Sequence, residues 1–122
     1  MKTVTSKKPN DAEVPRVSAS QIALLIEIAV LAVQDFKAQE AVTETHGIYI
    51  SALNRAEAKL GPLDGRLDPR DPDHAGVIAA TKPEYEARQR ARKTAYNVRR
   101  RLQTVCRKAV RVNAASNGDF IQ

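Results

Sequence analysis

The stretch from Gly47 to Arg55 holds the residues whose types and spacing best suit a chemical task, the reading of DNA bases. Gly47 can supply the positive φ that lets a chain turn between two helices. In a helix-turn-helix, the residues after the turn face the major groove of DNA, where asparagine can pair with adenine and arginine with guanine. The candidate contacts on this expected recognition helix, 49–60, are Tyr49, Ser51, Ala52, Asn54 and Arg55.

A turn-rich segment follows the expected recognition helix. Its prolines, aspartates and glycines between Pro62 and Gly76 oppose helix formation. Short apolar pieces at 63–67 and 77–80 predict a small β-hairpin around a polar tip. Three side chains of this hairpin, Arg66, Arg70 and His74, are the candidate contacts to the DNA backbone or the narrow groove beside it.

A long helix, 83–112, is predicted to complete the domain and to carry most of its positive charge. The chain has a net charge of +6, yet residues 1–87 hold ten Lys/Arg and thirteen Asp/Glu, whereas residues 88–122 hold ten Lys/Arg and one acid. So concentrated a positive field favours an anionic partner such as nucleic acid, and a solvated helix face is the plainer alternative. The candidate basic face comprises Arg92, Arg99, Arg100 and Arg107.

Apolar residues of this last helix alternate at spacings of four and three, which predicts a coiled-coil seam over three heptads. The seam comprises Ala91, Ala95, Val98, Leu102, Val105, Ala109 and Val112. The arginines beside it would repel a parallel identical copy, so an antiparallel or acidic partner helix is expected.

Three shorter helices are expected upstream, at 20–37, 39–45 and 49–60. Ser18 or Ser20 is a candidate N-cap for the first, and Leu60-Gly61-Pro62 ends the third. The first helix is apolar around nearly its whole circumference, which predicts that a second copy covers it in a homodimer. Residues 1–17 are expected to form a flexible arm, 18–112 the domain with its dimerisation helices, and 113–122 a tail.

Composition narrows the class of protein. A chain of 122 residues with 43% hydrophobic and 4% aromatic residues suits one helical domain. One cysteine fits a reducing cytoplasm, and the apolar run from Ile22 to Val33 is expected to be too short for a bilayer, so no membrane partner is predicted. The two histidines and the cysteine have no metal-ligand spacing, and no phosphate loop or nucleophile elbow occurs. No enzyme activity, cofactor or metal is therefore expected.

The order of these elements resembles the winged-helix regulators of the multiple-antibiotic-resistance regulator (MarR) family. The motifs that carry the resemblance are the stretches 20–25, 40–48, 51–55, 68–71 and 77–84, together spanning about residues 20 to 100. The chain departs from the family at Thr43, His46, Tyr49 and Ile50, and Pro72-Asp73 stands where the wing usually carries two arginines. The resemblance implies a mainly α fold, a winged helix-turn-helix with a small β-hairpin wing and a long C-terminal helix.

Two functions follow as expectations. The first is a dimeric transcription regulator that binds double-stranded DNA sequence-specifically, with helix 49–60 in the major groove. The second is a helical protein-interaction or inhibitor protein that uses its apolar seam and basic face without reading DNA, and the small basic chain would suit a phage. Residues 37–60, which include the expected recognition helix, carry three basic and three acidic side chains, so DNA binding would need the positive charge of 88–111 or of the N-terminal lysines on the same duplex. If the basic helix faces elsewhere, the second function applies. Arg55 could equally form a surface ion pair with Glu40 or Glu57.

Overall fold

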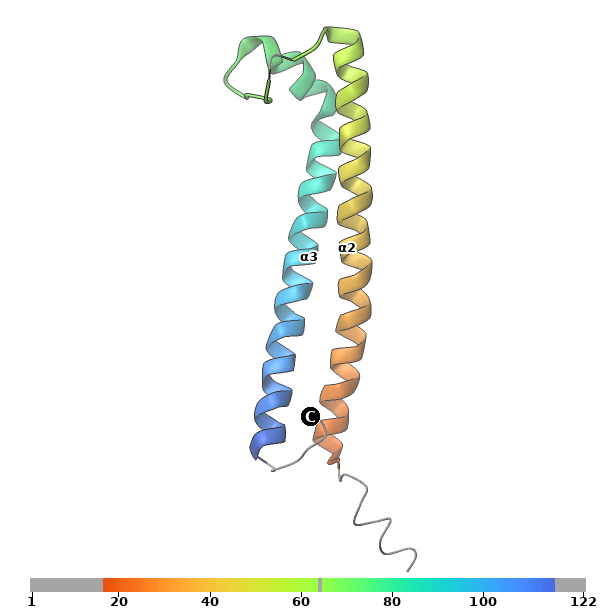
Figure 1. Ribbon diagram of the computed structural model, residues 1–122, viewed down its shortest axis with the longest axis vertical. Coiled ribbons are helices and arrows are strands. Elements are labelled where there is room, and N and C mark those ends of the chain that lie inside the picture. Colours follow the sequence, from red (N-terminus) through yellow and green to blue (C-terminus); the bar gives the residue numbers. More distant parts are fainter. Residues whose placement is uncertain (1–16, 64, 116–122) are drawn as a thin grey trace, which may run out of the picture. The chain divides into compact units, whose positions relative to one another are not determined.

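The protein is built from two long helices joined by a short loop (Figure 1). The computed structural model describes residues 17–63 and 65–115. Helix α2 spans Ala19–Leu60, the 3₁₀ helix η1 spans Pro72–His74 and helix α3 spans Ala75–Ala115. The expected arm at 1–17 and tail at 113–122 lie largely outside the described residues.

Two compact units divide the chain, and both helices contribute to each unit. Unit 1 comprises residues up to Ala32 together with those from Arg100 onwards, and unit 2 comprises Val33–Arg99. Each unit therefore pairs one segment of α2 with one segment of α3, which run side by side (Figure 1).

Helix α2 begins at a capping box. The Ser18 hydroxyl accepts a hydrogen bond from the Gln21 amide at 3.1 Å, and the Gln21 side-chain oxygen accepts one from the Ser18 amide at 2.7 Å. Each side chain thus satisfies a backbone donor that the first turn leaves free. The prediction of Ser18 as an N-cap is confirmed.

The predicted division of this region into three helices is wrong, because α2 continues without interruption from Ala19 to Leu60. Gly47, the expected turn residue, lies within the helix, and a Cβ built there would meet no atom within 4 Å outside the local backbone. Thr45 also adapts to the helix, since its hydroxyl donates to the Ala41 carbonyl at 2.7 Å. The helix outcompetes the turn because the long face against α3 stabilises every turn of α2.

That face follows a strict heptad. In α2 the spacing alternates between three and four, and every member is buried or half-buried: Gln21, Leu24, Ile28, Leu31, Asp35, Ala38, Val42, Thr45, Tyr49, Ala52 and Ala56. The predicted seam of α3 follows the same rule and extends further towards the loop, through Val77, Thr81, Glu84 and Arg88. The predicted antiparallel partner helix is therefore α2 of the same chain.

The loop between the helices is stabilised by successive short hydrogen-bonded turns. Gly61, at a φ of 102°, ends α2 and donates to the Glu57 carbonyl at 2.8 Å, as glycine does at helix C-termini. The Asp68 carboxylate accepts from the Arg70 amide at 2.9 Å, and the Asp71 carboxylate accepts from the Asp73 amide at 2.9 Å. The predicted helix stop at 60–62 is confirmed.

The predicted β-hairpin wing is wrong: the described part of the chain contains helices and turns but no strand. Residues 77–80, expected as its return strand, form the first turns of α3. Side chains of Asp68 and Asp71 accept hydrogen bonds from loop amides, which stabilises turns in place of strand pairing. Residues 77–80 are helical and therefore form no strand. The mainly α prediction and the long C-terminal helix hold, although α3 begins at Ala75 and includes Pro83 in its interior.

Candidate functional site

The residues expected to read DNA bases lie in the last third of α2, not on a separate recognition helix. Tyr49 and Ala52 are 6% and 5% exposed and belong to the seam with α3, which removes them from any groove of DNA. Ser51, Asn54 and Arg55 are exposed on the same helix. No helix-turn-helix therefore presents them, because the turn at Gly47 is not formed.

The three expected wing residues have separate roles. His74 is buried, and its Nδ1 accepts a hydrogen bond from the Asp68 amide at 2.9 Å. An amide can only donate, so Nδ1 carries no proton in this arrangement and Nε2 faces the Asp71 carboxylate at 3.5 Å. His74 thus stabilises the loop by joining Asp68 and Asp71. Arg70 is exposed in the turn, and Arg66 lines a cleft described below.

The expected basic face is divided between the two units. Arg92 is exposed in unit 2, and Arg100 and Arg107 are exposed in unit 1. Arg99, also in unit 2, instead forms a two-pronged ion pair with Asp35, with Nε–Oδ1 at 2.9 Å and Nη2–Oδ2 at 3.0 Å. This hydrogen-bonded guanidinium, together with its charge, lowers the pKa of Asp35 below its usual 3.8, and the carboxylate in turn raises the pKa of Arg99.

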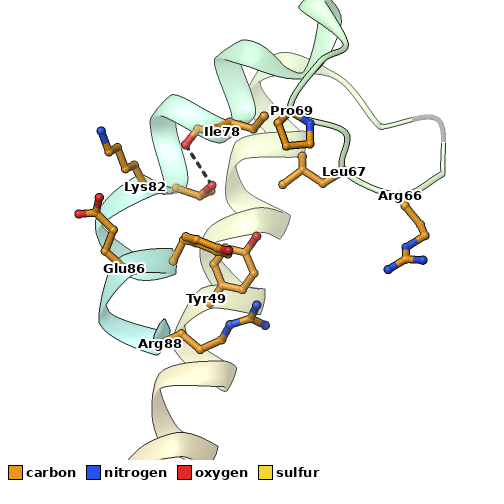
Figure 2. A pocket seen from close by; sticks show the side chains of 10 residues that line it. Tyr49, Arg66, Leu67, Pro69, Ile78, Lys82, Glu86 and Arg88 are labelled. Carbon is orange, nitrogen blue, oxygen red and sulfur yellow. Dashed lines mark hydrogen bonds between the residues drawn. The ribbon is translucent and has the colours of Figure 1, made fainter. Parts of the chain in front are cut away.

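Unit 2 contains a cleft of about 620 Å³ at its loop end (Figure 2). Its walls are aromatic and apolar, from Tyr49, Tyr85, Leu67, Pro69 and Ile78. Three cations, Arg66, Lys82 and Arg88, and one carboxylate, Glu86, also line it. Volumes of this order hold small organic ligands, and a mostly apolar lining with a few polar groups is typical of ligand sites.

Arg88 lies against both tyrosines of this cleft. Its guanidinium carbon lies 4.6 Å from the Tyr49 ring centroid and 5.5 Å from that of Tyr85, and the two rings meet edge to face at 5.6 Å. One terminal nitrogen lies 3.2 Å from His46 Nδ1. The Arg88 Nε is buried without a hydrogen-bond partner among the described residues. The side chain is therefore restrained by its ring contacts, while part of its donor capacity stays unused.

Sequence reasoning missed this cleft. It treated Arg88 only as the start of a basic run and gave Tyr85 no role. A signal was present, since Glu84 and Arg88 continue the spacing of four and three that begins at Ala91. Charged residues at seam positions lower the packing stability of a coiled coil, so their presence there suggests a role other than packing.

Unit 1 carries a different kind of surface, an apolar face of α2 that points away from α3. Ile26 lies two residues from both Leu24 and Ile28, which places it nearly opposite the seam, and Ile22 and Val30 flank it at roughly 130° from the centre of the seam. They are 48%, 60% and 51% exposed, and Leu25 beside them is 37% exposed. We refer to these four residues as the outward face. Clustered exposed aliphatic side chains of this kind mark interaction sites.

Helix α2 is also long and apolar enough, by length and composition alone, to cross a membrane. Its most apolar 18-residue window has a mean hydropathy of 1.6, and 17% of that window is buried. The apolar run that was expected to be too short for a bilayer ended at Val33, whereas helix α2 continues to Leu60. Core helices of soluble proteins and signal sequences satisfy the same criterion, so the predicted absence of a membrane partner stays a prediction.

Comparison with protein-family models, with curated proteins and with solved structures finds no match to this chain. Nothing in these comparisons supports the resemblance to MarR-type regulators. Among the described residues there is also no group of three or more His, Cys, Asp or Glu placed to hold a metal ion.

Proposed function

We propose that this chain is a helical interaction protein that joins a second copy of itself through the outward face of α2 in unit 1. The observation that carries the proposal is the exposure of Ile22, Ile26 and Val30 on a helix whose other side is already buried. Removing such side chains from water contributes about 1.5–3 kcal/mol for each one fully buried. An identical face on a second copy supplies a matching apolar surface.

The charge distribution of unit 1 supports the same arrangement. Its α3 segment carries Arg100, Arg101, Arg107, Lys108 and Arg111, whereas Glu27 is the acid among the described residues of the unit. Pairing two copies through α2 keeps the two α3 segments on the outer sides, so their like charges stay well separated. The basic residues then remain accessible to an anionic partner.

The test compares two substitutions of similarly exposed isoleucines. Ile26→Glu places a charge on the outward face, whereas Ile48→Glu places one on unit 2, where Ile48 is 50% exposed. Loss of one buried isoleucine from each copy should raise the dimer dissociation constant at least about a hundredfold. Sedimentation equilibrium over a wide concentration range measures this constant.

Three results would contradict the proposal. The wild-type chain would be a monomer at all concentrations, or Ile48→Glu would weaken association as much as Ile26→Glu. The wild-type chain would bind lipid vesicles in place of a second copy.

DNA binding is a second candidate, now supported by charge alone. The exposed arginines and lysines of α3 favour contacts to phosphates, which carry little sequence information. A salt-titrated binding assay against random duplexes, followed by sequencing of the retained DNA, tests it. Recovery of a palindromic motif at physiological salt would support a dimeric regulator, and motif-free binding that disappears with salt would limit the role to non-specific contact.

A further inference from the structure

We propose that the cleft in unit 2 binds a small anionic ligand, one that joins a carboxylate or phosphate group to a flat or apolar body. This proposal is independent of the dimer proposed above, because it rests on residues of unit 2 alone. The cleft juxtaposes two tyrosine rings and an apolar loop wall with the guanidinium groups of Arg66 and Arg88.

The arrangement of charge selects an anion. Figure 2 shows the guanidinium groups of Arg66 and Arg88 on the same side of the Tyr49 ring, with Lys82 and Glu86 directed to the other side. Among the described residues, the ion pair of Arg99 with Asp35 and the contact of His74 with Asp71 involve neither arginine. Neither arginine forms an ion pair with a described carboxylate, so the forked donors of each remain available to an oxyanion in the cleft.

Arg88 supplies the strongest part of the argument. Its cation–π contacts with Tyr49 and Tyr85 restrain the guanidinium, so less freedom remains to be lost when a ligand binds. Its buried Nε–H lacks an acceptor among the described residues, and an unsatisfied buried donor is unfavourable. A ligand oxygen that reaches this edge of the guanidinium would satisfy the donor and recover that free energy.

The apolar walls select the rest of the ligand. Tyr85, Leu67, Pro69 and Ile78 offer little to a bare ion, but they can bury a ring or a short apolar chain. The Thr81 hydroxyl at the cleft is already committed to the Val77 carbonyl at 2.8 Å, so it holds the helix more than it reads a ligand. The ligand class is therefore defined by a carboxylate or phosphate group joined to a flat or apolar body.

Isothermal titration with phenyl phosphate and with benzoate tests the proposal and separates phosphate from carboxylate ligands. We expect saturable binding of at least one of them at one site per chain. Inorganic phosphate lacks the ring and should bind at least about tenfold more weakly, as expected for a lost buried aromatic group. Benzylamine, with the opposite charge, should not bind.

Substitutions assign the site. Arg88→Met keeps an apolar stem in the seam and should weaken binding at least about tenfold, the fold-change expected for a lost charged hydrogen bond. Arg90→Met, on an exposed residue of the same helix that does not line the cleft, is the matched control and should leave binding unchanged. Circular dichroism verifies the fold of both. If Arg88→Met fails to fold, Arg66→Met on the exposed loop replaces it and should also weaken binding.

The proposal is overturned by any of four results. Neither aromatic anion binds saturably, or benzylamine binds as tightly as they do. Inorganic phosphate binds as tightly as phenyl phosphate. Arg90→Met weakens binding as much as the cleft variants, which would reveal only the general positive field of α3.

Discussion

The two units use the same heptad register but fill it with different chemistry. In unit 1 the seam is almost entirely aliphatic, with Leu24, Ile28 and Leu31 on α2 and Leu102 and Val105 on α3. In unit 2 the equivalent positions hold mostly small, polar or aromatic residues, and Val42, Val77 and Val98 are the aliphatic exceptions. The small, polar or aromatic residues include Asp35, Thr45, Tyr49, Ala52, Thr81, Glu84, Arg88 and Ala91.

The outer surfaces differ in a corresponding way. Unit 1 has more apolar surface than one pair of helices can bury, so its unburied outward face suits association with another protein chain. Unit 2 has fewer apolar seam residues, and its loop end contains a cleft in which an arginine contacts the rings of two tyrosines. A single coiled-coil register therefore runs through both the unit that we propose to self-associate and the unit that we propose to bind a ligand.

The largest expected effect tests whether unit 1 is the stronger apolar core. Leu31 is 2% exposed in its seam, so Leu31→Ala should lower the free energy of unfolding by about 2–5 kcal/mol. Ile48→Ala removes a side chain of similar size from the surface of unit 2 and should change it by less than about 0.5 kcal/mol. Urea unfolding followed by circular dichroism measures both. Equal effects would mean that Leu31 does not pack in a buried apolar core.

A smaller effect of opposite sign tests the continuity of α2 through unit 2. Glycine is less favourable than alanine within a helix by about 1 kcal/mol, and the space around Gly47 is open. Gly47→Ala should therefore stabilise the protein by about that amount in the same unfolding experiment. A turn with positive φ at this position would reverse the sign, so a destabilised variant would restore the helix-turn-helix interpretation.

The smallest effect concerns the ion pair of Asp35 and Arg99, and it depends on pH. Because the hydrogen bond from Arg99 lowers the pKa of Asp35 in the folded state, the pair stabilises the fold above the ordinary value of 3.8. That contribution is lost as the pH falls through the lowered folded-state pKa. Asp35→Asn should therefore show a shallower loss of melting temperature between neutral and strongly acidic pH than the wild type. Superimposable pH profiles would show that the pair adds nothing to stability.

The sequence predicted part of this fold well. The register from Ala91 to Val112 was legible because its apolar residues alternate with arginines and lysines on a helix of otherwise polar character. The glycine and proline after Leu60 marked the end of α2 for an equally local reason. Local signals of this kind do not depend on what packs against them.

The remainder depended on contacts between distant residues. Helix α2 is so apolar at its start that its seam does not stand out, and in unit 2 the seam passes through Asp35 and Thr45. Glycine is common in turns, but the packing of α2 against α3 keeps Gly47 helical. The cleft requires Tyr49 and Tyr85, 36 residues apart, to meet around Arg88, and no spacing along the chain announces such a meeting.

The loop of closely spaced hydrogen bonds in unit 2 also sets an order of folding. The Asp68–His74 contact joins residues 6 apart, the His46–Arg88 contact joins residues 42 apart and the Asp35–Arg99 pair joins residues 64 apart. Once the loop between α2 and α3 has formed, each further contact between the two helices closes only a short additional segment of chain. Helix pairing can then proceed outward from the loop, and most of the loop-closure entropy is lost in the first step. We expect substitutions near the loop to slow folding and substitutions near Asp35 chiefly to speed unfolding, which stopped-flow kinetics of His74→Asn and Asp35→Asn would distinguish.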